Sequence, residues 1–166
     1  MNRLNYVQIS KDDETHFENA SSLWVPFIKE VNKNDGIIQN DEQILNGLKK
    51  RIAIQGTRKE MHFEIAFLNH VPIGIAMFAI DLGTVYGLLN SGYGTVMGFY
   101  IHPKYRRKGF GTEFWLHIEN SLRKDGAFEF YICPDLVTGV PFWENFGFKD
   151  SGLIDPDDKK HIYIKN

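Results

Sequence analysis

The sequence predicts a mixed α/β (α+β) fold, and three observations lead to this prediction. The chain has 166 residues, of which 43% are hydrophobic and 24% charged, a composition typical of a globular domain with a buried core. Segments whose apolar residues alternate are interspersed with segments whose apolar residues recur every three or four positions. A glycine-rich turn joins one strand-like segment to a helix-like one. We expect a single domain over residues 1–166.

The first third of the chain is predicted to form one strand and two helices. Asn5–Ile9 alternates between polar and apolar residues and predicts a strand. The helical pattern that follows is amphipathic, and we expect a break near Pro26. Residues 34–36 have the composition of a turn. Asn40 and Gln43 have the spacing of a capping box that opens the second helix.

The middle of the chain is predicted to be mostly β. Phe63–Leu68 and Ile73–Asp81 flank a turn at residues 69–72, which predicts a hairpin. A glycine-rich stretch leads to a further strand over Thr95–Ile101, and Thr112–Arg123 follows as an amphipathic helix.

The last part adds three strands and a short helix. Phe128–Ile132 predicts a strand, and Pro141–Phe146 predicts a helix with proline in its first turn and Gly147 after its end. Two strands follow, one from Phe148 and one over His161–Ile164. The predicted order is therefore β-α-α-β-β-β-α-β-α-β-β.

The segment Arg106-Arg-Lys-Gly-Phe-Gly-Thr112 has the chemistry of an anion site. Gly109 and Gly111 allow a tight turn that brings successive N–H groups together. The helix that begins there adds its unpaired amides and the positive end of its dipole. Four of the 19 cationic side chains of the chain lie at positions 104–108, namely Lys104, Arg106, Arg107 and Lys108. A ligand with a diphosphate group is the natural inference.

The segment also has features in common with three other kinds of site. A Walker loop needs a lysine between the last glycine and the hydroxyl residue, and Gly111 is followed directly by Thr112. A dinucleotide fingerprint needs a third glycine, where Phe114 stands. A nucleic-acid site would suit the basic run but not the net charge of −2. A solvated turn before a helix is the remaining alternative.

Two motifs in register resemble a known family. Ile101-His-Pro-Lys-Tyr-Arg-Arg-Lys-Gly-Phe-Gly-Thr112 is similar to the signature of the GNAT superfamily of N-acetyltransferases, in which [Gln/Arg]-x-x-Gly-x-[Gly/Ala] opens a helix after a strand. Phe142-Trp-Glu-Asn-Phe-Gly-Phe148 resembles the Leu/Phe-Tyr-x-x-x-Gly-Phe motif of that family. The resemblance implies a mixed, mostly antiparallel sheet of about seven strands flanked by about four helices.

The resemblance also implies acetyl-CoA, or another acyl-CoA, as co-substrate. The pantetheine would lie along the strand at Phe99, Tyr100 and Ile101, and Trp143 would also contact the coenzyme. Gly98 fits a β-bulge that parts two strands, or a close packing contact. The diphosphate would lie on the loop, whose implied ligands are Arg106, Arg107, Lys108, Gly109, Phe110, Gly111 and Thr112. No metal is implied.

The catalytic residues are less well defined. Trp143 stands where the family motif has a tyrosine acid, and an indole N–H donates hydrogen bonds but does not act as a proton acid. A thiolate leaving group with a thiol pKa of about 8.5 can leave without an acid. Tyr131 and Glu129 are the candidates for acid and base, with a cleft wall or a solvated strand as their alternatives. The asparagine of many relatives is replaced near Asp135 or Leu136.

Acceptor recognition in this family comes from the first two helices and from the loop between the third and fourth strands. The aromatic residues available there are Trp24, Phe27, Tyr86 and Tyr93, and the acidic ones Glu14, Glu18 and Glu30. The acidic residues could attract a cationic amine, whereas the alternative places the aromatics in the core and the glutamates on a solvated helix face.

Several weaker signals complete the prediction. His102 titrates near neutrality but precedes a proline, which favours a surface turn. Cys133 is the only cysteine, so the chain forms no internal disulfide, in keeping with a reducing cytoplasm. The uncharged run Leu82–Ile101 is rich in glycine and tyrosine and is not expected to cross a membrane. We expect no nucleic-acid partner and allow for a homodimer.

The sequence thus predicts a cytoplasmic enzyme of the N-acetyltransferase type that acts on a primary amine of a small molecule or peptide. The acetyl group would pass from acetyl-CoA by direct attack in a ternary complex. The alternative is an acyl-CoA-binding sensor of the same fold that has lost turnover, which the tryptophan at position 143 suggests.

Overall fold

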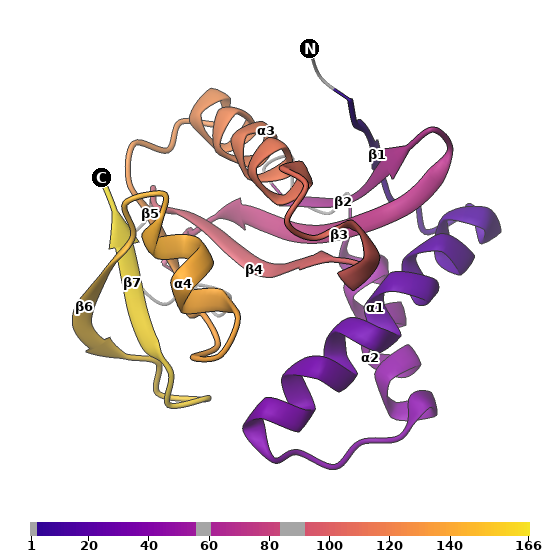
Figure 1. Ribbon diagram of the computed structural model, residues 1–166, viewed down its shortest axis with the longest axis horizontal. Coiled ribbons are helices and arrows are strands. Elements are labelled where there is room, and N and C mark those ends of the chain that lie inside the picture. Colours follow the sequence, from indigo (N-terminus) through magenta and orange to yellow (C-terminus); the bar gives the residue numbers. More distant parts are fainter. Residues whose placement is uncertain (1–2, 56–60, 84–91) are drawn as a thin grey trace. The chain divides into compact units, whose positions relative to one another are not determined.

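The computed structural model describes residues 3–55, 61–83 and 92–166, and these residues form the elements in the predicted order (Figure 1). The elements are β1 (Asn5–Gln8), α1 (Glu14–Asp35), α2 (Asp41–Ile54), β2 (Met61–Leu68), β3 (Val71–Ile80), β4 (Gly94–Ile101), the 3₁₀ turn η1 (Pro103–Tyr105), α3 (Phe110–Lys124), β5 (Phe130–Ile132), α4 (Gly139–Glu144), β6 (Lys149–Ile154) and β7 (His161–Lys165). The fold class is therefore confirmed.

The described strands form one seven-stranded sheet in the order β1-β2-β3-β4-β5-β7-β6. β1 pairs antiparallel with β2, and β7 pairs antiparallel with both β5 and β6. β4 and β5 are parallel, and their register covers Gly94 with Phe130 and Thr95 with Tyr131. This short register lies at the start of β4, which continues to Ile101.

The chain divides into two compact units. The first consists of Met1–Met77 and Gly98–Ile118, and the second of Phe78–Met97 and Glu119–Asn166. The expectation of a single domain over residues 1–166 stays a prediction. None of the helices within the described ranges combines the length and the apolar character that a membrane crossing requires.

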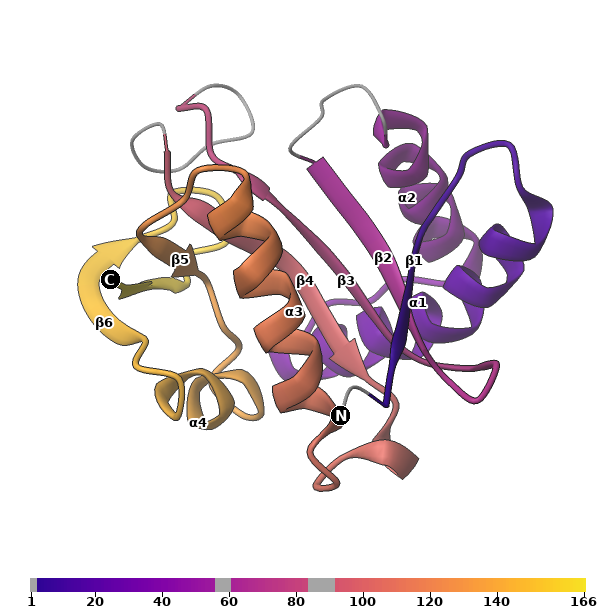
Figure 2. The same cartoon turned by 90° about the horizontal axis from the view of Figure 1, so that it is seen from above.

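In the first unit, α1 and α2 lie on one face of the strands and the start of α3 lies on the other (Figures 1 and 2). Because successive side chains of β4 point to opposite faces of the sheet, the strand packs against helices on both faces. Tyr100 stacks on Phe27 of α1 at 5.4 Å, whereas Phe99 faces Phe114 of α3 at 5.5 Å. The end of β4 is thus packed from both sides.

The predicted break near Pro26 is wrong, because α1 runs without interruption from Glu14 to Asp35. Proline removes one backbone hydrogen bond, but packing of the apolar face contributes more to a helix than that bond. That face buries Ala20, Leu23 and Trp24. The capping box of α2 is present as predicted, with Asn40 and Gln43 bonded to each other's backbone.

The hairpin between β2 and β3 is tighter than predicted. Its turn consists of Asn69 and His70, which have φ angles of 47° and 68°, and β3 already begins at Val71. Two consecutive positive φ angles are the mark of a type I′ turn, whose twist matches that of the flanking strands.

Candidate functional site

The loop before α3 has the backbone geometry of an anion site. Residues 106–109 form a turn in which Arg107 and Gly109 have φ angles of 61° and 84°. The hydrogen bond that opens α3 runs from Glu113 N to the carbonyl oxygen of Gly109, the residue before the helix, over 3.0 Å. The amides of Phe110, Gly111 and Thr112 precede this bond and therefore have no partner within the helix. Such a group of amides at a helix N-terminus attracts an anion.

The exposed cations of the loop suit a diphosphate group. Arg107 and Lys108 are exposed. The Nζ atoms of Lys104 and Lys108 each lie 5.9 Å from the centre of the Tyr105 ring. No carboxylate in the described part of the chain pairs with Lys104, Arg107 or Lys108. Backbone amides together with cations are the donor set that a diphosphate needs, so the residues present fit the coenzyme.

Arg106 differs from the other cations of the loop. Its Nε donates to Ile101 O at 2.7 Å, and its Nη2 donates to both carboxylate oxygens of Glu30, at 3.1 and 2.8 Å. The guanidinium also lies 5.3 Å from the centre of the Tyr100 ring. The side chains of Arg106 and Glu30, which the sequence assigned to the coenzyme and to the acceptor, thus contact each other.

The residues assigned to the pantetheine differ in exposure. Phe99 is half-buried, whereas Tyr100 and Ile101 are buried. Burial raises the pKa of the Tyr100 phenol, Arg106 lowers it and Glu30 raises it, and the net shift is upward. Gly98 lies against the rings of Trp24 and Phe27. This favours the packing contact over a bulge as the reason for a glycine there.

The N-terminal segment holds the loop from its other side, which sequence analysis missed. The Glu113 carboxylate accepts from the amides of Arg3 and Leu4 at 2.7 and 2.8 Å and from Arg3 Nε at 3.3 Å. Arg3 Nη2 donates to Lys108 O at 3.2 Å, and its guanidinium lies 4.3 Å from the centre of the Phe110 ring. The only sequence signal was an acidic residue in the first turn of a helix.

In the second unit, Tyr131 is hydrogen-bonded to an acidic residue that was not among the candidates from the sequence. Its hydroxyl donates to Asp81 Oδ2 at 2.8 Å, and the two residues are 3% and 2% exposed. Asp81 Oδ1 accepts from Gly83 N at 2.6 Å. The backbone of Asp81 also pairs with Tyr93 O and Gly92 N at 2.7 and 2.9 Å. Asp-x-Gly directly after a strand was the available sequence signal.

Glu129 and Tyr93 lie next to this pair. Tyr93 is half-buried, and its ring centre is 6.1 Å from that of Tyr131. A hydrogen bond to Glu129, together with burial and the charge of that carboxylate, raises the pKa of Tyr93. Glu129 itself precedes β5, and its carbonyl accepts from Gly94 N at 2.9 Å. The structure therefore brings Asp81, Tyr93, Glu129 and Tyr131 together; we call these four residues the second-unit cluster.

Trp143 is part of an aromatic group within the second unit. It is 5% exposed, and its ring centre is 4.9 Å from that of Phe142 and 5.4 Å from that of Phe148. Position 143, where the motif that this segment resembles has a tyrosine, thus holds a buried tryptophan whose indole packs against two phenylalanine rings. Its contact with the coenzyme stays a prediction.

The remaining acceptor candidates are spread over α1 and its surroundings. Trp24 is 3% exposed and packs against Phe27 and Phe63, with ring centres 5.2 and 5.3 Å away. This burial favours the core alternative for Trp24, whereas Phe27 is half-buried. Glu14 and Glu18 are exposed. Tyr86 lies outside the described residues.

Three weaker candidates have structural roles. His102 Nδ1 accepts from Lys104 N at 3.3 Å and so caps η1. Burial, with Asp155 and Asp158 nearby, raises the pKa of the Cys133 thiol to about 12, so it is a poor nucleophile. Asp135 accepts from the amides of Val137 and Thr138 at 3.0 and 2.8 Å. In the described ranges no group of three or more His, Cys, Asp or Glu is arranged to hold a metal ion; the absence of a metal stays a prediction.

Comparison with protein-family models gives evidence that does not depend on the structure. The model of the acetyltransferase (GNAT) family matches residues 20–148, which include the loop before α3 and most of the described elements. A search of curated proteins gave no match.

Solved structures with the same fold cover nearly the whole chain. PaiA N-acetyltransferase from Thermoplasma acidophilum, in complex with coenzyme A, is 19% identical with a TM-score of 0.70 and 98% of each chain covered. An acetyltransferase from Thermus thermophilus is 13% identical with a TM-score of 0.73 and 99% of each chain covered. AAC(6′)-Iy, in complex with the bisubstrate analogue CoA-S-monomethyl-acetylneamine, is 16% identical with a TM-score of 0.66, covering 92% of this chain and 95% of that one. At these identities the likeness concerns the fold.

Proposed function

Because the chain belongs to the acetyltransferase (GNAT) family, we propose that it is an N-acetyltransferase that uses acetyl-CoA and acts on a primary amine of a small molecule or peptide. The observation that carries this proposal is the loop before α3, where the turn with positive φ at Arg107 and Gly109 leads into the unpaired amides of the helix. The coenzyme A complex of the PaiA structure supports the choice of co-substrate.

In this proposal the loop holds the diphosphate through the amides of Phe110, Gly111 and Thr112, and Arg107 and Lys108 neutralise its charge. The backbone of Phe99, Tyr100 and Ile101 provides groups for the pantetheine. When bound, acetyl-CoA supplies a thioester whose carbonyl carbon is attacked by the amine nitrogen, and the C–S bond breaks.

The second-unit cluster is the proposed source of proton transfer. The amine must lose a proton when the C–N bond forms, and the thiolate can gain one. Glu129 is the candidate base and Tyr131 the candidate acid, with Asp81 accepting the hydrogen bond that orients the Tyr131 hydroxyl. Trp143 stays in its packing role.

A coenzyme-binding experiment tests the proposal. We expect wild-type protein to bind coenzyme A by calorimetry, and Gly109→Ala to weaken that binding at least tenfold, because a side chain at a φ of 84° distorts the turn. Gly126→Ala is the matched control, since Gly126 also has a positive φ, of 109°, but lies in the second unit. Absence of binding by wild-type protein would refute the proposal.

A non-catalytic coenzyme sensor is the second candidate, and the buried indole of Trp143 favours it. Release of free thiol over a panel of amines, including aminoglycosides and peptides, separates the two functions. An enzyme releases thiol faster than the blank with at least one amine, and Tyr131→Phe slows it about 10²–10⁴-fold if the hydroxyl acts as acid. A sensor binds coenzyme A and gives only the blank rate with every amine.

A further inference from the structure

We propose that Arg106 and Glu30 form an internal brace that positions the loop before α3, and that Arg106 is not a ligand of the coenzyme phosphates. Arg106 is thus a positioning residue, although it occupies the first position of the loop motif. The inference rests on the proposed function for its effect on coenzyme binding, but the brace itself is testable in the free protein.

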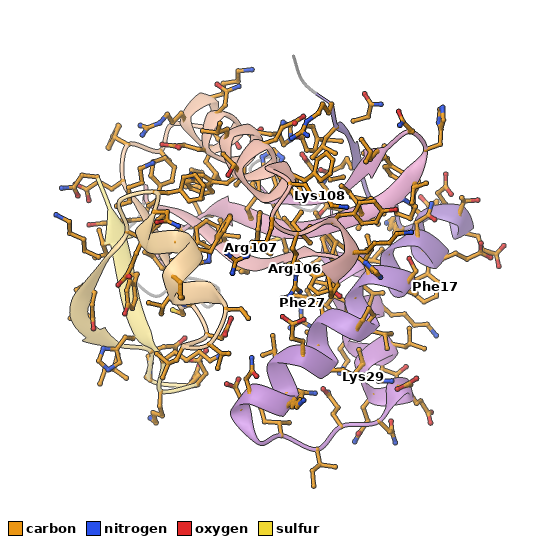
Figure 3. All side chains as sticks on the ribbon, viewed as in Figure 1. Phe17, Phe27, Lys29, Arg106, Arg107 and Lys108 are labelled. Atoms are coloured by element: carbon orange, nitrogen blue, oxygen red, sulfur yellow. The ribbon has the colours of Figure 1, made fainter. Side chains whose placement is uncertain are left out.

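The guanidinium of Arg106 joins the end of β4 to α1. Its Nε donates to the carbonyl of Ile101, the last residue of β4, and its Nη2 donates to both oxygens of Glu30 in the second half of α1. Arg106 and Phe27 of α1 are both labelled in Figure 3. The two side chains are 31% and 30% exposed, so the pair is only partly screened by water.

Ring stacking extends the same connection. The guanidinium lies over the ring of Tyr100 at 5.3 Å, and Tyr100 stacks on Phe27 at 5.4 Å with an angle of 30° between the rings. A planar fork can bond to a carbonyl and a carboxylate and stack on an aromatic ring at the same time, which the single point charge of lysine cannot do. The contacts of Arg106 use its Nε toward β4 and its Nη2 toward α1, and a lysine would not reproduce this combination.

Charge leads to the same conclusion. Glu30 neutralises Arg106, whereas Lys104, Arg107 and Lys108 have no carboxylate partner in the part of the chain that the structure describes. These three side chains provide the positive charge for a diphosphate. The Glu30 carboxylate is in turn neutralised by Arg106, which argues against its predicted role in attracting a cationic acceptor.

The two roles for Arg106 predict opposite effects of Glu30→Gln on coenzyme binding. If Arg106 binds phosphate, this variant frees the guanidinium and removes a negative charge, so the Kd for coenzyme A falls or stays the same. If the brace positions the loop, the variant loosens Arg106 and the Kd rises. Arg106→Lys separates them again, because lysine retains the charge but not the fork.

The experiment measures the Kd of coenzyme A by calorimetry for wild type, Arg106→Ala, Arg106→Lys, Glu30→Gln and the double variant Arg106→Ala/Glu30→Gln. The matched control is Asp41→Asn, which also replaces a carboxylate by an amide and breaks an ion pair of α1, the 2.7 Å contact with Lys29. Each single variant at positions 30 and 106 is expected to raise the Kd about tenfold, and the double variant no further, because coupled residues are not additive.

If the protein catalyses acetyl transfer, steady-state kinetics provide a second test of the brace. Loss of positioning remote from the reacting atoms removes uniform binding, so the KM for acetyl-CoA rises while kcat stays within about twofold. The brace is overturned if Glu30→Gln binds coenzyme A as tightly as Asp41→Asn does, or if Arg106→Lys binds like wild type.

Amide hydrogen exchange of the free protein keeps this test separate from the proposed function. We expect the amides at positions 106 and 113, which donate to Pro103 O and Gly109 O at the two ends of the loop, to exchange faster in both Arg106→Ala and Glu30→Gln than in Asp41→Asn. Unchanged exchange in both variants overturns the brace. If wild-type protein binds no coenzyme, the proposed function fails, and the exchange result alone decides whether the brace exists.

Discussion

At the residue scale, two glycines allow close packing within the first unit, Gly74 against β4 and Gly98 against α1. A Cβ at Gly74 would lie 2.8 Å from Ile101 Cδ1 and 3.0 Å from the carbonyl oxygen of Tyr100. A Cβ at Gly98 would lie 3.2 Å from Cη2 of Trp24. The contact at Gly74 includes backbone, which cannot turn aside as a flexible side chain can.

We therefore expect Gly74→Ala to lower the free energy of unfolding by about 1–3 kcal/mol through overpacking. The control is Gly47→Ala in the interior of α2, where a Cβ would meet only Arg51 Nη1 at 3.4 Å. Alanine is the better helix former, so the control should gain about 0.5–1 kcal/mol. Urea unfolding measures both. If Gly74→Ala does not lower the free energy of unfolding relative to Gly47→Ala, overpacking at position 74 is ruled out.

At the element scale, the two helices after β1 are defined by their ends. Asp13 caps α1 by accepting from His16 N, and Gly36 ends it with a φ of 69°. Asn40 and Gln43 close the capping box of α2. These signals are local in sequence, which is why they could be predicted. The continuity of α1 through Pro26 was not predicted, because it depends on what the helix packs against.

Asn40→Ala tests the capping box. We expect it to lower the free energy of unfolding by about 1 kcal/mol, since the Gln43 amide loses its acceptor. For a chain of this size the Tm should fall by about 2–4 °C, measured by thermal unfolding followed by circular dichroism. Asn46→Ala, on the exposed side of α2, serves as the control and should be neutral or slightly stabilising. An equal loss in both variants would assign the effect to something other than the cap.

At the scale of the whole molecule, a buried carboxylate ties the layers of the first unit together. Glu64 of β2 contacts His117 of α3 at 2.6 Å and His62 at 3.6 Å. The ring of Tyr6 from β1 stacks on His117 with centres 3.7 Å apart. Burial pushes the pKa of Glu64 up, but hydrogen bonds and charge from the two histidines outweigh it, and the pKa is lowered.

This lowered pKa predicts acid sensitivity. Because the native state holds the Glu64 proton less tightly than the unfolded state does, its contribution is fully present above the unfolded pKa of about 4.3 and is lost as pH falls through the lower native value. Glu64→Gln should cost about 1.5–3 kcal/mol at pH 7. The difference from wild type should shrink between about pH 5 and pH 3.

Urea unfolding at a series of pH values from 7 to 3 measures this effect. Glu18→Gln on the exposed surface of α1 is the control and should follow wild type at every pH. If the gap between wild type and Glu64→Gln stayed constant down to pH 3, the assignment of this acid sensitivity to Glu64 would be wrong.

The sequence alone determined the order of the elements, the capping box and the loop that opens α3, because periodicity, caps and glycine turns act over a few neighbouring residues. It also determined the family, through two motifs that each cover about a dozen residues or fewer. Within the candidate site, sequence analysis predicted the glycine turn before the helix, and it named Tyr131 and Glu129 as candidates whose catalytic roles stay predictions.

The tertiary structure decided which side chains of the site contact one another. Arg106 and Glu30 are 76 residues apart in the chain, Tyr131 and Asp81 are 50 apart, and Arg3 and Glu113 are 110 apart. The sequence alone does not show whether a charged side chain contacts a ligand or a carboxylate that lies far away along the chain. Only the packing of α1 against β4 distinguishes these cases for Arg106, because ion pairing depends on distance in space and not on separation along the chain.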